Sequence, residues 1–190
     1  SAGMFNTIVA QGLVARSGAG LPFLPAFSKL IQIPEKAQVV VDVVSSQFTD
    51  YQLSDLSGNS YQLMPYQPGI SKSHTGEIPF YFNNAAYQVN EFIQPVRAKA
   101  TIHGNLRNMR LATLDIHPFD YNPATNTLRV YEKLVLNISF PGADQGLTNL
   151  LSERYSDFCF AGPAARIINH DAFRTAKDTA THYPVKMVIV

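Results

Sequence analysis

The side chains of this sequence that could carry out covalent catalysis are one cysteine, Cys159, and five histidines. The histidines are His74, His103, His117, His170 and His182. Acyl transfer needs a cysteine or serine nucleophile beside a histidine base, with donors for the developing oxyanion. The sequence has no Gly-x-Ser-x-Gly elbow, and Cys159 lies between two phenylalanines, which is typical of a small apolar side chain in a core. The pattern therefore predicts no catalytic residue in this chain.

The sequence also lacks the spacings that hold metal ions and cofactors. It contains no His-x-x-x-His pair, no Cys-x-x-Cys pair and no aspartate-rich calcium loop. The glycine-rich segment 16–22 lacks the lysine and the hydroxyl residue of a Walker A phosphate loop. We therefore predict no metal and no cofactor, and we interpret segment 16–22 as a turn.

The remaining candidate is a loop spanning residues 61–87. Prolines and glycines at 65, 68, 69, 76 and 79 disfavour a helix or a central strand, while apolar residues at both ends can anchor in a core. The tip carries one full positive charge, Lys72, beside Ile70, Ser71 and Ser73. This pattern indicates a basic side chain held out for a partner. A solvated surface lysine is the simpler interpretation from composition alone.

The composition bounds the class of protein. A chain of 190 residues, 46% hydrophobic and 15% charged, is long and apolar enough to fold around a core. The formal net charge of +1 and the pI of about 7.8 do not indicate a nucleic-acid partner. No apolar run approaches the roughly 20 residues that cross a bilayer, so we expect no membrane span. One cysteine cannot form a disulfide bond within the chain.

Alternation of apolar and polar residues predicts a chain built mostly of β-strands. The strand candidates are residues 4–14, 30–33, 38–44, 51–56, 61–64, 96–103, 106–118 and 128–140. We expect burial on both faces of 38–44, a turn at 104–105, and hairpins within 51–64 and 106–140. Many short strands with few helical periods favour an antiparallel sandwich or barrel.

The C-terminal part has a different character. Helical spacing predicts short helices at 147–155 and 164–169. Residues 173–182 are polar and typical of an exposed connector, and residues 183–190 begin an apolar strand. We interpret this last strand as the start of a following domain.

Several segments, in order and spacing, resemble a known family. They are Gly-Leu-Pro-Phe-Leu-Pro at 20–25, Lys-Leu-Ile-Gln-Ile-Pro at 29–34, Leu-Met-Pro-Tyr-Gln-Pro at 63–68, Ile-Pro-Phe-Tyr-Phe-Asn-Asn-Ala-Ala-Tyr at 78–87 and Ser-Phe-Pro-Gly-Ala-Asp at 139–144. Together they are similar to the N-terminal propeptides of gingipain-type cysteine peptidases of the lysine-specific kind. Residues 183–190 are similar to the opening strand of the mature catalytic domain in that family.

The resemblance implies an all-β fold, an antiparallel β-sandwich (jelly-roll-like) with short C-terminal helices. It implies a non-catalytic prodomain that keeps a secreted endopeptidase, a virulence factor, latent by covering its active-site cleft, and that assists its folding. The implied partner is the cognate catalytic domain in cis. The implied location is exported, in the periplasm, at the outer-membrane surface or outside the cell. In the family a basic side chain of an extended loop fills the S1 specificity pocket, and that position matches Ser71-Lys72-Ser73, with Ile70 before it.

A lysine suits such a role because its ammonium group gains charge-assisted hydrogen bonds inside an acidic pocket. The resemblance divides the chain into a prodomain at 1–165, a connector with processing sites at 166–182, and the first strand of a catalytic domain at 183–190. The family's basic residue before an aspartate is replaced here by His170-Asp171. The processing candidates are therefore Arg166, His170, Arg174 and Lys177.

Two other functions remain open at the level of sequence. A surface adhesion or carbohydrate-binding sandwich would need exposed aromatic side chains in a groove. A free-standing hydrolase would need Cys159 as its nucleophile.

Overall fold

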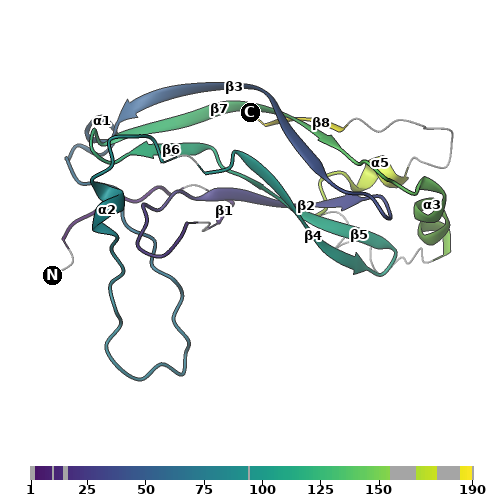
Figure 1. Ribbon diagram of the computed structural model, residues 1–190, viewed down its shortest axis with the longest axis horizontal. Coiled ribbons are helices and arrows are strands. Elements are labelled where there is room, and N and C mark those ends of the chain that lie inside the picture. The colour runs from purple at the N-terminus through teal and green to yellow at the C-terminus, as the bar shows by residue number, and fades with distance from the viewer. Residues whose placement is uncertain are drawn as a thin grey trace. The chain divides into compact units, whose positions relative to one another are not determined.

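The computed structural model describes residues 3–9, 11–14, 17–93, 95–154, 166–174 and 185–189 (Figure 1). One sheet has the strand order β1-β2-β5-β4, and a second has the order β3-β7-β6, with β8 paired to β7. The strands are β1 (Leu13–Val14), β2 (Ala26–Ile33), β3 (Val40–Gln52), β4 (Ala98–Leu106), β5 (Met109–Ile116), β6 (Phe119–Asn122), β7 (Thr127–Ser139) and β8 (Val185–Ile189). The pairings β1–β2, β4–β5, β6–β7 and β7–β8 are antiparallel.

The helices are short. They are α1 (Leu53–Ser57), α2 (Asn84–Tyr87), α3 (Gln145–Arg154) and α5 (His170–Arg174). Two antiparallel sheets with short helices toward the C-terminus confirm the predicted all-β fold class.

The chain divides into two compact units that interleave in sequence. The first unit comprises Ser1–Phe27, Gln47–Arg97 and His117–Glu132, and the second comprises Ser28–Ser46, Ala98–Ile116 and Lys133–Val190. The loop at 61–87 therefore belongs wholly to the first unit.

The first unit is built on a core cluster of four leucines and one tyrosine. They are Leu24, Leu53, Leu63, Tyr121 and Leu128. Leu63 is 1% exposed, and burying such a side chain stabilises the folded chain by about 1.5–3 kcal/mol. The N-terminal end of the 61–87 loop is therefore anchored in the core, as its apolar residues predict.

The second unit buries one face of β5 and of the C-terminal half of β7. Along β5, Ala112, Leu114 and Ile116 are buried, as the alternation predicts. Along β7, Leu134, Leu136 and Ile138 are buried, also as the alternation predicts.

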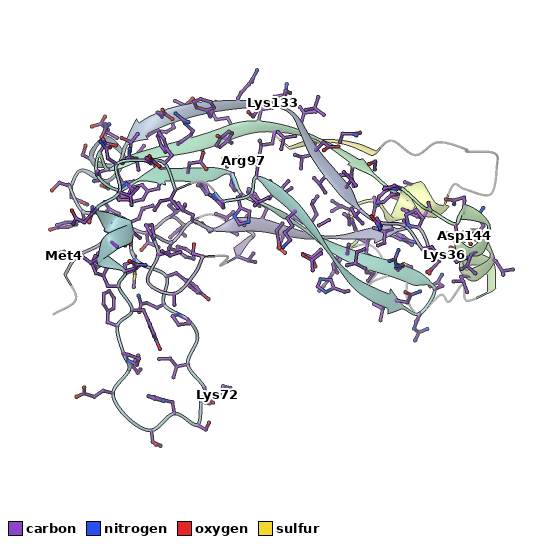
Figure 2. The ribbon with its side chains drawn as sticks, in the orientation of Figure 1. Met4, Lys36, Lys72, Arg97, Lys133 and Asp144 are labelled. Carbon is purple, nitrogen blue, oxygen red and sulfur yellow. The ribbon has the colours of Figure 1, made fainter. Side chains whose placement is uncertain are left out.

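The helix α3 confirms the helical spacing after residue 141, and it begins at a capping aspartate. Asp144 Oδ1 accepts a hydrogen bond of 2.9 Å from the Leu147 amide, and Lys36 Nζ lies 2.8 Å from Asp144 Oδ2 (Figure 2). The hydrogen bond from Lys36 is the main cause that holds the pKa of the Asp144 carboxyl below its usual value.

The hairpin expected within 51–64 is wrong. Residues Leu53–Ser57 form α1, and the Gly58 amide donates 2.8 Å to the Ser54 carbonyl with φ of 70° at Gly58. A glycine in the left-handed conformation is a common helix end, and Leu53 is buried by the turn of helix. The Gly-Asn pair therefore terminates a helix and does not join two strands.

The hairpin expected within 106–140 is also wrong. Strand β5 lies in the first sheet beside β4, and β7 pairs with the short strand β6 through a turn at 123–126. The predicted turn at 104–105 is a register shift in the β4–β5 ladder, and the reversal comes at Arg107, where φ is 56°. Strand pairing is non-local, so alternation within one segment does not identify its partner.

Three smaller expectations also differ. Strand β3 covers 38–44 only in part, and Val40, Val43 and Val44 are exposed at the edge of their sheet, where we expected burial on both faces. Among the described residues of segment 4–14, only Leu13–Val14 is a strand. Of the helix expected at 164–169, residues 166–169 form a turn with one bridge and the next described helix begins at His170, while 164 and 165 lie outside the described residues.

Candidate functional site

The base of the loop is closed by one glutamine side chain. Gln67 Oε1 accepts from the Tyr81 amide at 2.9 Å, and Gln67 Nε2 donates to the Tyr81 carbonyl at 2.8 Å. These two bonds imitate the paired bonds of a β-ladder, so the two legs of the loop are held together without a strand. We call residues 68–80, which lie beyond this clamp, the displayed loop.

A glycine joins both legs to the N-terminal segment. The Gly20 amide donates to the Tyr66 carbonyl at 2.9 Å, and the Gly20 carbonyl accepts from the Asn83 amide at 3.0 Å. Gly20 has φ of 77°, and a Cβ there would lie 3.0 Å from the Asn83 nitrogen. Only glycine fits this position, so the segment predicted as a turn also ties the loop base.

Aromatic rings pack around the same base. The ring of Phe5 lies 6.0 Å from Phe80 and 6.3 Å from Phe82, and Phe82 lies 4.6 Å from Tyr87. Ring pairs at such separations add stabilisation beyond their buried area. The second leg is thus fixed to the N-terminal segment by packing as well as by a backbone hydrogen bond.

Two buried tyrosines complete the anchor on the core side. The Tyr87 hydroxyl donates to the Leu63 carbonyl at 2.7 Å, and the Leu63 amide donates to the Tyr121 hydroxyl at 3.3 Å. Burial raises the pKa of Tyr121 to about 12 and raises the pKa of Tyr87 further above its ordinary value. Both hydroxyls therefore stay protonated at neutral pH.

The displayed loop extends away from α2 (Figure 1), and every residue from 69 to 85 is exposed. Figure 2 shows Lys72 close to its far end. Within the described residues Lys72 makes no hydrogen bond and no ion pair. It is also the one lysine or arginine between residues 61 and 87. An uncompensated ammonium group is therefore held in solvent on an anchored base.

The second leg of the loop carries exposed apolar side chains. Ile78 is 70% exposed, and Phe80 and Tyr81 are about two-fifths exposed, at 42% and 41%. Ile70, before the lysine, is 40% exposed. A run of apolar side chains exposed beside a displayed charge is typical of a protein interaction site.

Arginines cover three aromatic rings of the first unit outside the loop. The Arg129 guanidinium lies 4.0 Å from the centroid of the Phe48 ring and 4.2 Å from that of Phe92. Arg97 lies 3.6 Å from the Tyr131 centroid and contacts both oxygens of the buried Asp120 at 2.8 Å. A carbohydrate-binding sandwich would offer aromatic rings to a sugar. Here a guanidinium group already covers one face of the Phe48, Phe92 and Tyr131 rings.

The processing candidates lie in the second unit. Arg166 is in an exposed turn, Arg174 is the last residue of α5, and Lys177 lies outside the described residues. His170 begins α5, with its amide 3.1 Å from the Ile167 carbonyl and Nδ1 3.2 Å from Gln32 Oε1. The structure assigns no role to any of the four.

The remaining chemistry-bearing residues form no recognisable site. Among the described residues, no group of three or more His, Cys, Asp or Glu could hold a metal ion. His103 Nε2 lies 2.6 Å from Thr113 Oγ1 on neighbouring strands, and Cys159 and His182 lie outside the described residues. In the same part of the chain, no helix is long and apolar enough to cross a bilayer.

Comparison with protein families gives a match over most of the chain. The sequence model of the Propeptide_C25 family matches residues 1–154, which include the whole loop and its anchors. This chain belongs to the Propeptide_C25 family. Lys-gingipain of Porphyromonas gingivalis is 33% identical over 189 residues, or 99% of this chain. Gingipain R2 of the same species is 28% identical over 124 residues, or 65% of this chain.

The chain spans only 11% of the length of Lys-gingipain and 16% of that of Gingipain R2. Two solved structures share the fold of this chain. One is a structure that gives insight into the zymogenic latency of gingipain K from P. gingivalis, and its sequence is 35% identical to this chain. The two superimpose with a TM-score of 0.64 over 70% of this chain and 72% of the other. The complex of RgpB pro- and mature domains has a TM-score of 0.63 at 23% identity, over 85% and 77% of the two chains.

These similarities confirm the resemblance to gingipain propeptides and the interpretation of the chain as a non-catalytic prodomain. The buried Leu63 and Tyr87 confirm the predicted anchored ends of the loop, and Lys72 is exposed as expected, while its role stays a prediction. Sequence reasoning missed Gln67 and the role of Gly20 at the loop base. The Ser-Gly-Ala-Gly-Leu-Pro run at 17–22 offered a signal, since a cluster of serine, glycine and proline marks a turn.

Proposed function

We propose that this chain keeps a gingipain-like cysteine endopeptidase latent, and that its partner is the catalytic domain of the same precursor. The observation that carries the proposal is the loop clamped at Gln67 and Tyr81, which holds Lys72 in solvent without a partner among the described residues. Lys72 enters the S1 specificity pocket of the peptidase, with Ile70, Ser71 and Ser73 beside it in the cleft.

The anchored base explains how one side chain can silence an enzyme. A loop that is already ordered loses little conformational entropy on binding, and a lysine in an acidic pocket makes charge-assisted hydrogen bonds. Covalent attachment to the catalytic domain raises the effective concentration to the order of millimolar. Modest intrinsic affinity is then sufficient until the connector is cut.

A prodomain that binds the folded catalytic domain, and not its unfolded form, also stabilises the folded form by mass action. We therefore propose that the prodomain assists folding of the catalytic domain. The yield of refolded catalytic domain, with and without this chain, measures that effect, and equal yields would exclude it. Similarity to gingipains favours export to the periplasm, the outer-membrane surface or the medium. Cell fractionation with an antibody to this chain tests the location, and recovery from the cytoplasm alone would contradict it.

We also propose that release follows cleavage in a connector at 166–182, between a prodomain at 1–165 and a catalytic domain that opens at 183–190. Arg166, Arg174 and Lys177 are basic and suit a lysine- or arginine-specific cut. His170 suits it less, because it is neither lysine nor arginine. N-terminal sequencing of the mature enzyme separates the four, and a start beyond residue 190 would reject them all.

The test of latency uses the mature catalytic domain of Lys-gingipain as the probe enzyme and this 190-residue chain as the inhibitor. We expect Lys72→Ala to weaken inhibition at least about 30-fold, because truncating one partner of a buried charge pair costs about 2–5 kcal/mol. Lys133→Ala, at another exposed lysine (Figure 2), is the matched control and leaves the inhibition constant unchanged. Equal inhibition by the native chain and Lys72→Ala would reject the role of Lys72.

A further inference from the structure

The tip of the displayed loop is a tight turn with Lys72 at its corner. The His74 amide donates to the Ser71 carbonyl at 3.0 Å, which places Lys72 and Ser73 at the two central positions of a β-turn. The described non-glycine residues with positive φ are Lys36, Arg107 and Asn126, so both central residues of this turn have negative φ. Negative φ at both positions fits a type I turn and excludes type II, which needs positive φ at the second.

Two serine hydroxyls brace this turn from either side of the lysine. Ser71 Oγ lies 2.8 Å from Ser73 Oγ, and the Ser73 amide donates to Ser71 Oγ at 3.3 Å. Serine side chains that bond to nearby backbone favour turns over extended chain. The backbone on both sides of Lys72 is therefore held in the bent conformation by side chains of the loop itself.

A bent backbone at the lysine is unfavourable for hydrolysis. Peptides that bind by strand addition do so in extended form, and attack on a carbonyl needs reacting atoms within about 3–3.5 Å in the correct orientation. In a type I turn the chain reverses direction immediately after Lys72. The lysine side chain can therefore project into a pocket while its carbonyl carbon lies away from the position that an extended substrate would give it. A displacement of about 1 Å can already slow such a reaction about 100-fold.

We propose that Ser71 and Ser73 are positioning residues that make the loop an inhibitor and not a substrate. Hydrolysis of the Lys72–Ser73 bond would consume one water, leaving a carboxylate on Lys72 and a new amino group on Ser73. The braced turn slows this step while it leaves the ammonium group free to bind. The identity of the peptidase in this inference rests on the proposed function. The turn and its resistance to cleavage are properties of this chain alone.

The experiment compares cleavage of the folded 190-residue chain by trypsin, which cuts after lysine and arginine, and by the mature catalytic domain of Lys-gingipain. The variants are the double change Ser71→Ala with Ser73→Ala, and Thr75→Ala as the matched control. Thr75 is an exposed hydroxyl residue of the same loop with no side-chain hydrogen bond among the described residues. Mass spectrometry follows the fragment that begins at Ser73 or at its alanine replacement. Cleavage after Lys99, inside β4, serves as the internal reference for unfolding of the whole chain.

We expect trypsin to cut the double variant after Lys72 about tenfold faster than the native chain, because two weak hydrogen bonds no longer oppose the extended form. Thr75→Ala is cut at the native rate, and the ratio of the Lys72 cut to the Lys99 cut rises only in the double variant. With Lys-gingipain, the double variant inhibits first and loses inhibition as it is cut.

If trypsin cuts the native chain and the double variant after Lys72 at equal rates, the inference is overturned. This failure is distinct from failure of the proposed function. If Lys72→Ala inhibits Lys-gingipain as well as the native chain does, latency through Lys72 is rejected, and the trypsin measurement still decides whether the serines brace the turn.

Discussion

Lys72 makes no hydrogen bond and no ion pair with the described residues, so its position depends on residues that hold the loop at a distance from it. Gln67 joins the two legs through the backbone of Tyr81, and Gly20 joins both legs to the N-terminal segment. A lysine on a free loop would lose conformational entropy on binding that an anchored lysine has already lost. We therefore expect the affinity of the displayed loop for its proposed partner to depend partly on Gln67 and Gly20, which lie outside the displayed loop.

Replacing Gly20 with alanine tests this dependence. We expect Gly20→Ala to lower the free energy of unfolding by about 1–3 kcal/mol, because the left-handed φ and the close backbone of Asn83 both oppose a Cβ. Gly69→Ala is the matched control, since a Cβ at Gly69 would meet nothing within 4 Å. Urea unfolding of the two variants measures the difference. Equal stability of Gly20→Ala and Gly69→Ala would show that Gly20 does not tie the loop base.

The loop as an element is held at its core side by Tyr87 of α2 and Tyr121 of β6, and the charge state of these tyrosines sets the stability of the anchor. Burial raises both phenol pKa values above the ordinary value of 10.0, to about 12 for Tyr121. The folded state therefore prefers the protonated phenols. Their contribution is fully present below pH 10, where both folded and unfolded chains are protonated, and is lost as pH rises through the folded pKa values.

We accordingly expect the free energy of unfolding to fall between about pH 10 and pH 12, and the fall to be smaller in Tyr87→Phe. That variant also loses the hydrogen bond to Leu63, at a cost of about 0.5–1.5 kcal/mol at neutral pH. Tyr61→Phe, at an exposed tyrosine, is the control and keeps the native pH profile. Denaturant titrations across this range provide the measurement, and a flat profile for the native chain would contradict the buried anchor.

The same elements show what the sequence can and cannot predict. Alternation along 109–116 and 134–138 was sufficient to find buried faces, because burial repeats every second residue. Prolines and glycines were sufficient to find the loop. Strand partners were not predictable from alternation, and neither was the role of Gly20, because both depend on contacts between residues far apart in sequence. The exposed valines of β3 were misjudged because apolar composition does not report what covers a strand.

On the scale of the whole molecule, the proposed roles in latency and release belong to different units. The first unit contains the displayed loop, and the second contains the described processing candidates, Arg166, His170 and Arg174. Latency and release would then depend on different segments, so a cut in the connector need not alter the loop. The released prodomain would keep its affinity but lose the advantage of covalent attachment, and dilution would free the enzyme.

The most direct test of this account is the chemical reactivity of the Lys72 amine in the complex. An amine-acylating reagent is applied to the free chain and to the chain bound to Lys-gingipain whose catalytic cysteine is replaced by alanine. Mass spectrometry then gives the extent of labelling at Lys72, with Lys133 as the reference. We expect binding to lower the labelling rate of Lys72 by at least about tenfold, because an ion-paired ammonium in a closed pocket is shielded from the reagent. Labelling of Lys72 at the same rate in the free and the bound chain would contradict this account.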